Sequence, residues 1–169
     1  CVPNLLMAEW NFNTTSATPA TPPPSTNNVG TAAASVSLAG GVFSYETTNH
    51  SAPYSWGIYP FPLNKSTSAY FQFAIAKGSF EDISFSFWVS KKSNNGPTSM
   101  DVNWSSQADF STSTSLATNL SIADKVWTQH TLPTISPAPA VTYFRVYVYG
   151  SKNSTGADNI IYVDDVRFT

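Results

Sequence analysis

The last eleven residues constrain the fold of this chain more than any other segment. They read Asn-Ile-Ile-Tyr-Val-Asp-Asp-Val-Arg-Phe-Thr, residues 159–169. Because side chains alternate between the two faces of a strand, one face receives Ile160, Tyr162, Asp164, Val166 and Phe168. That face is apolar except for Asp164. A carboxylate turned toward a sheet core is costly unless it is paired, hydrogen-bonded or bound to a cation, so we expect the fold to give Asp164 a partner.

The same alternation recurs along the chain and predicts an all-β protein. We predict about nine strands, near residues 5–12, 35–38, 42–45, 70–76, 83–90, 99–104, 126–132, 143–149 and 160–168. Clusters of Ser, Asn, Gly and Pro separate them, and the Pro-rich stretch 53–62 is interpreted as a loop. Strands of this number and spacing are typical of a jelly-roll β-sandwich of two antiparallel sheets.

Four apolar rows are expected to form the core between the two sheets. They are Phe71, Phe73 and Ile75; Ile83, Phe85, Phe87 and Val89; Met100, Val102 and Trp104; and Phe144, Val146 and Val148. Alternation turns the residues between them outward. The outward row of most interest is Tyr143, Arg145, Tyr147 and Tyr149.

Composition excludes several classes of function. Charged residues make up 11% of the chain and the net charge is −2, with no basic run longer than Lys91-Lys92, so we expect no nucleic-acid partner. No stretch reaches the roughly 18 apolar residues of a membrane span. The two histidines, His50 and His130, lie in no nucleophile elbow or Gly-rich turn. We therefore predict that the protein is not an enzyme.

The chain divides into three predicted parts: an N-terminal strand in residues 1–15, a Thr/Pro-rich spacer in residues 16–28, and the jelly-roll sandwich in residues 29–169. The prolines of the spacer favour an extended polyproline conformation of about 3 Å per residue. Two arrangements follow. The first strand returns to its own sandwich, or it is exchanged with a neighbouring molecule.

Two kinds of modification are expected. The chain begins with Cys1, which is typical of a lipidated bacterial lipoprotein after signal-peptide removal; the alternative is a chain boundary that falls at a Cys. There are six N-x-S/T sequons, against about three expected by chance. They are Asn13, Asn49, Asn64, Asn103, Asn119 and Asn153. With the Thr/Pro-rich spacer, they predict a glycosylated extracellular surface.

Several motifs together carry a resemblance to a known family. They are Ala-Glu-Trp-Asn-Phe at 8–12, Tyr-Phe-Gln-Phe at 70–73, Ile-Ser-Phe-Ser-Phe at 83–87, Asn-Gly-Pro-Thr-Ser at 95–99, Trp-Thr-Gln-His-Thr at 127–131, Phe-Arg-Val-Tyr-Val-Tyr-Gly at 144–150 and Ile-Tyr-Val-Asp-Asp-Val at 161–166. The chain resembles jelly-roll domains of bacterial secreted surface proteins, including those with PEP-CTERM sorting tails, which are similar in fold to carbohydrate-binding modules. The resemblance implies an extracellular or cell-surface location and carries over no catalytic residue.

The same resemblance implies a structural Ca²⁺ between the first and last strands. Asp164 would be a ligand, with Glu9, Asn11 or Asn13 from the first strand supplying further oxygens. The alternative is that Asp164 accepts hydrogen bonds from loop amides and binds no metal. Alternation turns Asp165 outward, and we expect it to be an ordinary solvated carboxylate.

Two functions remain open. The first is a non-enzymatic extracellular structural protein, a self-assembling surface or pilus-like filament subunit whose partner is another copy of itself. The apolar strand beyond a stiff spacer motivates it. The alternative is a carbohydrate-binding module that binds a polysaccharide with Tyr143, Arg145, Tyr147, Tyr149 and Trp88. Gln72, Asp101 and Asn103 would be their neighbours.

Overall fold

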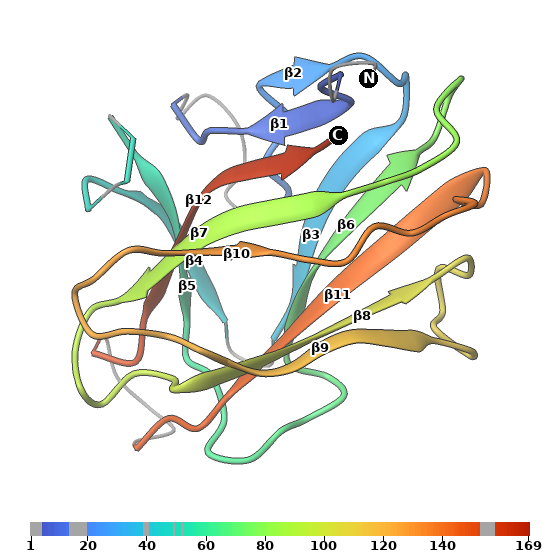
Figure 1. Cartoon of the computed structure of the whole chain (residues 1–169). Coiled ribbons are helices and arrows are strands. Elements are labelled where there is room, and N and C mark those ends of the chain that lie inside the picture. Colours follow the sequence, from blue (N-terminus) through green and yellow to red (C-terminus); the bar gives the residue numbers. More distant parts are fainter. Residues whose placement is uncertain (1–4, 14–19, 39–40, 49, 52, 153–157) are drawn as a thin grey trace.

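Alternating apolar and polar residues form twelve strands in the computed structural model (Figure 1), which describes residues 5–13, 20–38, 41–48, 50–51, 53–152 and 158–169. The strands are β1 (Ala8–Trp10), β2 (Thr26–Asn27), β3 (Ala32–Ser37), β4 (Val42–Glu46), β5 (Ser55–Tyr59), β6 (Tyr70–Ala76), β7 (Phe85–Lys91), β8 (Ser99–Ser105), β9 (Thr114–Ser121), β10 (Thr128–Thr131), β11 (Val141–Tyr149) and β12 (Ile161–Phe168). In the described part of the chain, no helix is long and apolar enough to span a membrane.

The strands pair into two antiparallel sheets that face each other. The β12 sheet runs in the order β10-β7-β12-β1-β2, and β5 also pairs with β12 and carries β4 on its other side. The β11 sheet runs in the order β3-β6-β11-β8-β9. The predicted jelly-roll β-sandwich is therefore confirmed.

The core lies between the sheets and is built largely from aromatic rings. Every residue of the four predicted apolar rows is buried except Trp104, which is half-buried. Phe85 of β7 and Phe168 of β12 stack with their ring centroids 4.7 Å apart and their planes 2° from parallel. Offset aromatic packing of this kind adds to the stability gained from burying apolar area.

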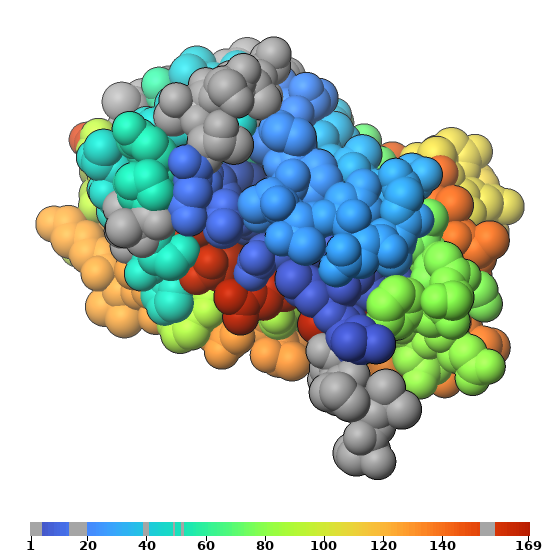
Figure 2. Space-filling model, turned by 90° about the horizontal axis from the view of Figure 1, so that it is seen from above, coloured from blue at the N-terminus to red at the C-terminus, as the bar shows by residue number. Residues whose placement is uncertain are grey.

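The first strand completes its own sandwich. β1 pairs with β12, and Trp10 is 1% exposed with its ring 5.0 Å from that of Phe73. The Trp10 Nε1–H group donates to the Pro22 carbonyl at 2.9 Å. Figure 2 shows the red atoms of β12 between the dark blue N-terminal segment and the teal atoms of the β4–β5 region. The feature that motivated strand exchange, an apolar strand without a place in its own sheet, is not found in this structure.

The end of the predicted spacer also belongs to the sandwich. Ser25 N–H donates to the Glu9 carbonyl at 2.7 Å and Asn28 N–H donates to the Met7 carbonyl at 2.8 Å, so the chain returns along β1 as β2. Residues 16–19 of the predicted spacer lie outside the described residues. Thr26–Asn27 at its end form β2 of the β12 sheet, and the preceding residues are held to β1 by the Ser25–Glu9 and Trp10–Pro22 hydrogen bonds.

Three strands were not predicted from the sequence. β2 is a two-residue strand in the Pro-rich segment. β5 lies between Pro53 and Pro60, and because prolines are typical of loops, the sequence analysis interpreted this stretch as a loop. β9 reads Thr-Ser-Leu-Ala-Thr-Asn-Leu-Ser and forms the edge of the β11 sheet, where little of it is buried. Short or edge strands carry a weak apolar pattern because they cover little core.

The last strand contains a β-bulge after Asp164, and the prediction that the residues before this bulge face the core on their even-numbered side is wrong. Asp164 is paired with Trp88 of β7, on the outer face, because cross-strand partners share a side of the sheet. The register shifts beyond Asp164, and Asp165 has a positive φ of 44°. This β-bulge adds one residue and exchanges the two faces of the strand. The core therefore receives Ile161, Val163, Val166 and Phe168.

Candidate functional site

The outer surface of the β11 sheet carries the richest set of polar and aromatic side chains predicted to bind a ligand. We call it the β11 face and define it by Tyr70, Gln72, Asp101, Asn103, Tyr143, Arg145, Tyr147 and Tyr149. On β11, Phe144, Val146 and Val148 are fully buried on the core side, so alternation turns the intervening residues outward. The register sets Arg145 between Gln72 of β6 and Asn103 of β8.

Arg145 is fixed by contacts on several sides. Its guanidinium carbon lies 4.2 Å from the centre of the Tyr70 ring and 3.9 Å from that of Phe110. Its Nε donates to Gln72 Oε1 at 2.7 Å, and Nη2 donates to the Ala108 carbonyl at 3.0 Å. A guanidinium has five N–H donors, so these two hydrogen bonds orient the group and leave donor capacity for a ligand.

A second anchored group lies at the end of the same row. The Tyr149 hydroxyl is 2.9 Å from both Asp101 Oδ1 and Asn119 Oδ1, and it donates its one proton to one of them at a time. Lys65 Nζ lies 2.5 Å from Asp101 Oδ2, and Asn119 N–H donates to Oδ1 at 2.8 Å. Burial raises the pKa of Asp101, but these hydrogen bonds outweigh it and lower the pKa below its usual value. The carboxylate thus stays ionised and holds Tyr149 in place.

The predicted residues differ in how much ring surface they offer. Tyr147 is buried, packed edge-on against Tyr70 at 5.7 Å and beneath the Lys65 ammonium at 5.5 Å. Tyr143, Arg145 and Tyr149 are partly exposed. The ligand-accessible part of the row is therefore Tyr143, Arg145 and Tyr149, with Tyr147 as a supporting ring.

The structure separates Trp88 from the other predicted binding residues. Trp88 lies on β7, on the outer surface of the opposite sheet. The His50 ring stacks on it at 3.7 Å with an interplanar angle of 15°, which covers one face of the indole. Trp88 does not belong to the β11 face, so grouping it with Tyr143, Arg145, Tyr147 and Tyr149 is wrong.

The sequence analysis missed one residue of the β11 face, Tyr70, and three residues that contact the face, Lys65, Phe110 and Asn119. Tyr70 directly precedes the buried row Phe71, Phe73 and Ile75, so the alternation of side chains along a strand would have placed it on the outer face. Lys65 and Phe110 come from loops, and Asn119 comes from the unpredicted strand β9. No local pattern predicts that loop residues will fold back over a particular sheet face.

The sequons and Cys1 are distributed unevenly over the structure. Cys1, Asn49 and Asn153 lie outside the described residues. Asn13 and Asn64 are exposed, whereas Asn103 is half-buried in the β11 face and Asn119 holds Tyr149. A glycan on Asn103 or Asn119 would cover this face. Lipidation and glycosylation stay predictions.

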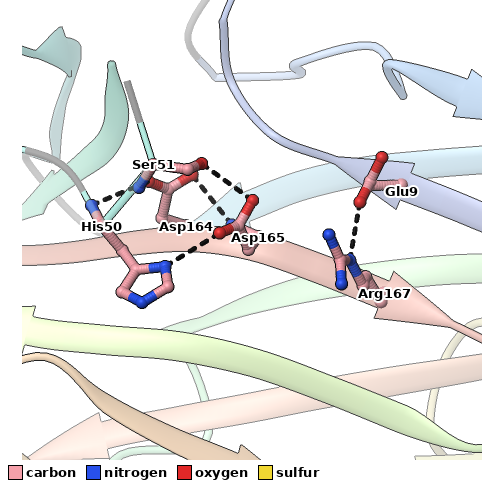
Figure 3. Close-up of polar contacts among 6 residues, drawn as sticks. All are labelled: Glu9, His50, Ser51, Asp164, Asp165 and Arg167. Atoms are coloured by element: carbon pink, nitrogen blue, oxygen red, sulfur yellow. Dashed lines mark hydrogen bonds and ion pairs between the residues drawn. The ribbon is translucent and has the colours of Figure 1, made fainter. Parts of the chain in front are cut away.

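Asp164 is fully buried under the segment that contains His50 and Ser51. Its Oδ2 accepts the backbone N–H groups of His50 and Ser51, both at 3.0 Å, and its Oδ1 accepts the N–H of Asp165 at 2.8 Å. Figure 3 shows this carboxylate pointing at the two loop amides. Burial raises the pKa of Asp164 to about 6, against the lowering effect of the three N–H donors.

Asp165 is also bound to the loop and is not the solvated carboxylate that alternation predicts. Its Oδ2 lies 2.9 Å from His50 Nδ1, and its Oδ1 accepts the Ser51 hydroxyl at 2.9 Å. The side chain of Asp165 is 12% exposed. Both carboxylates therefore fasten the same loop to the bulge of β12.

The residues proposed to hold calcium have separate partners. Glu9 Oε1 accepts Arg167 Nε at 2.6 Å, and Asn11 Oδ1 accepts the Asn13 N–H at 3.2 Å (Figure 3 shows the Glu9–Arg167 pair). Among the residues that the structure describes, no group of three or more His, Cys, Asp or Glu side chains could hold a metal. These contacts fit the hydrogen-bonded alternative, and they do not fit a calcium site built on Asp164, Glu9 and Asn11.

Comparisons with known proteins give a fold but no family. No protein-family model and no curated protein matches the sequence. The C-terminal family 22 carbohydrate-binding module of Clostridium thermocellum Xyn10B superposes with a TM-score of 0.61 at 11% identity, over 99% of this chain and 95% of that one. The CBM22-1 xylan-binding domain of Paenibacillus barcinonensis Xyn10C gives 0.55 at 8% identity, over 80% and 83%.

A third structure extends the likeness to another family. TmCBM61, determined in complex with β-1,4-galactotriose, superposes with a TM-score of 0.53 at 11% identity, over 83% of this chain and 88% of that one. At such low identities the likeness shows a shared jelly-roll fold. The resemblance to carbohydrate-binding modules is thus confirmed for the fold, and the association with PEP-CTERM surface proteins stays a prediction.

Proposed function

We propose that this chain is a non-catalytic carbohydrate-binding module that binds a neutral polysaccharide across the β11 face. The observation that carries the proposal is the Arg145 guanidinium, held between two aromatic rings with N–H donors to spare, in one row with the anchored Tyr149 hydroxyl. Sugar rings offer apolar C–H faces and many hydroxyl groups, so partly exposed aromatic rings beside oriented donors match their chemistry.

The charge of the face supports a neutral ligand. The Asp101 carboxylate is neutralised by Lys65, and Asp109 lies near enough to Arg145 for the cation to lower its pKa, after the larger effect of its hydrogen bonds to Ser111. The shared fold with modules whose structures are described as xylan-binding or bound to β-1,4-galactotriose adds support. The proposal includes an extracellular location, because the chain has few charged residues and six N-glycosylation sequons.

Self-assembly into a surface filament was the first function favoured by the sequence. Its main motivation was a first strand available for a neighbouring molecule, but here Trp10 is buried in its own sandwich. The comparisons support the carbohydrate-binding alternative better. Homo-oligomerisation stays a prediction.

Affinity electrophoresis through gels that contain xylan, β-1,4-galactan or no polysaccharide tests the proposal. We expect at least one of the two polysaccharides to retard the wild-type chain. Arg145→Ala should weaken that binding by about tenfold or more, because a hydrogen bond to a charged group contributes about 1.5–3 kcal/mol. Gln129→Ala, an exposed change on the opposite sheet, is the matched control. Equal retardation of Arg145→Ala and wild type would contradict the proposed site.

A further inference from the structure

A groove on the outer side of the β12 sheet lies apart from the β11 face. It has a volume of about 540 Å³, and its lining includes Ser90, Lys92, Lys125, Trp127 and Tyr162. Ser90 lies on β7 and Lys92 just after it, Tyr162 lies on β12, and Lys125 and Trp127 precede β10. All are parts of the β12 sheet or its connections. The two sheets face each other across the core, so this groove and the β11 face look away from each other.

Two aromatic rings and a small residue shape the groove. On one side of β7, Tyr162 of β12 pairs with Ser90. On the other side, Thr128 of β10 pairs with Val89, so Trp127, which precedes Thr128, lies beside Ser90. The Trp127 and Tyr162 rings have centroids 6.5 Å apart and planes inclined by 41°. Ser90, Trp127 and Tyr162 all line the groove, and the small side chain of Ser90 lies at its base.

The floor of the groove contains an unused hydrogen-bonding group. Ser90 is 1% exposed, and its hydroxyl has no hydrogen-bond partner among the described residues. Buried hydroxyl groups in proteins are almost always satisfied, so this one points to a hydrogen-bonding ligand or an ordered water. Trp127 is only partly buried, so part of its ring is exposed where it lines the groove.

Cations are concentrated at this groove in a chain whose net charge is −2. Three of its eight Lys and Arg side chains line the groove, at Lys91, Lys92 and Lys125. Lys152 lies close enough to contribute to lowering the pKa of Lys91, after the larger effect of burial. Nearby anions are Asp158, which is 3.6 Å from Lys92, Asp124, which interacts with Lys91, and Glu46, whose charge acts on Tyr162. Four lysines and three carboxylates leave the cluster at a net charge of +1.

We propose that this groove binds an acidic saccharide through a carboxylate or sulfate group. The lysine cluster supplies the charge that an acidic group requires, the Trp127 ring offers a surface for an apolar sugar face, and the Ser90 hydroxyl can bond a sugar hydroxyl. A simple inorganic anion would use the lysines but neither the ring nor the buried hydroxyl. The site is additional to the β11 face and differs from it in the charge of its ligand.

Isothermal titration calorimetry with oligogalacturonate and with a sulfated galactan oligosaccharide tests the proposal. Binding of the first alone identifies a carboxylate ligand, binding of the second alone identifies a sulfate ligand, and binding of both identifies a site that accepts either; each of these results supports the proposal. Lys125→Gln should weaken the binding up to about fivefold, since an exposed ion pair contributes about 0.2–1 kcal/mol. Trp127→Ala should weaken it by about tenfold, because ring contact adds to area burial.

The controls separate a saccharide site from a general cationic surface. Lys77→Gln makes the same charge change outside the groove and should leave both affinities unchanged, and Lys125→Arg should retain binding. The proposal is overturned if neither probe binds, if Lys125→Gln and Lys77→Gln behave alike, or if polyglutamate displaces the saccharides at equal charge concentration. Loss of xylan or galactan binding has no bearing on these results, so the two proposals can fail independently.

Discussion

Asp164 shows how one side chain repairs a gap in a sheet. On one side of β12, β5 pairs with Ile161–Val163 and β1 pairs with Val166–Phe168, which leaves the bulge between them without a backbone partner on that side. The N–H groups of His50 and Ser51 fill this position and donate to the Asp164 carboxylate. The carboxylate therefore acts as an acceptor where the sheet would otherwise supply a carbonyl.

The first prediction concerns the pH dependence of stability. The pKa of Asp164 is about 6 in the folded chain against an ordinary value of 3.8, so between these values the folded chain keeps a proton that the unfolded chain releases. This contribution to stability is fully present below about pH 4 and is lost as the pH rises to about 6. Burial and the neighbouring Asp165 raise this pKa, while the N–H donors, including that of His50, lower it.

Urea denaturation of the wild type and of Asp164→Asn between pH 3 and 8 measures this effect. Asn keeps an oxygen for the two loop amides but does not ionise, so the decline in unfolding free energy between about pH 4 and 6 should be smaller in the variant. Asp109→Asn, an exposed change, is the control for the general effect of removing a charge. Parallel pH profiles for wild type and Asp164→Asn would contradict the assigned pKa.

The second prediction concerns metal removal. Because the Asp164 oxygens face N–H donors and Glu9 is paired with Arg167, a chelator should leave the melting temperature of the wild type unchanged. Differential scanning calorimetry with and without EDTA, followed by added Ca²⁺, gives the answer. A fall with EDTA that Ca²⁺ reverses would restore the calcium interpretation.

At the scale of elements, β1 and the Pro-rich segment that returns along it act together. The Trp10 indole fills the core and also donates to the Pro22 carbonyl, which joins β1 to the segment before β2. On its other side, β1 is tied to β12 by an ion pair between Glu9 and Arg167. This arrangement gives Pro22 a role within the sandwich, as the hydrogen-bond partner of the Trp10 indole.

The third prediction follows from this arrangement. Trp10→Ala should lower the free energy of unfolding by about 3–5 kcal/mol, since it leaves a large cavity and an unpaired carbonyl. Leu5→Ala, at a side chain that is 56% exposed, should change it by less than about 0.5 kcal/mol. Urea denaturation with sedimentation analysis measures stability and mass together. A folded Trp10→Ala chain with unchanged stability and a lost oligomeric state would instead support strand exchange.

The same elements show what the sequence could predict. The sequence predicted the core rows and the two faces of β11 because side chains alternate without interruption along these strands. Phe71 to Ile75 and Tyr143 to Tyr149 are examples. The bulge at Asp165 was not readable, because a single inserted residue reverses the two faces without changing the residue types. The need of Asp164 for a partner was predicted correctly, but the identity of that partner depended on a loop more than a hundred positions away in the chain.

At the scale of the whole molecule, the sandwich presents two chemically different outer surfaces. The β11 face combines aromatic rings with ion pairs and hydrogen bonds that are largely satisfied within the chain, which favours a neutral ligand. The groove on the β12 sheet concentrates lysines around Trp127. A module with both surfaces could contact two kinds of polysaccharide at once, and binding at two sites raises the effective concentration of each.

Amide chemical-shift changes in the isotope-labelled chain, followed as xylohexaose or β-1,4-galactotriose is added, show directly whether the β11 face binds a neutral polysaccharide. We expect saturable shifts for one of these sugars, concentrated at Gln72 on β6, at Asn103 on β8 and along Tyr143–Tyr149 on β11. Shifts confined to β7, β10 and β12, or no saturable shifts with either sugar, would contradict the proposed function.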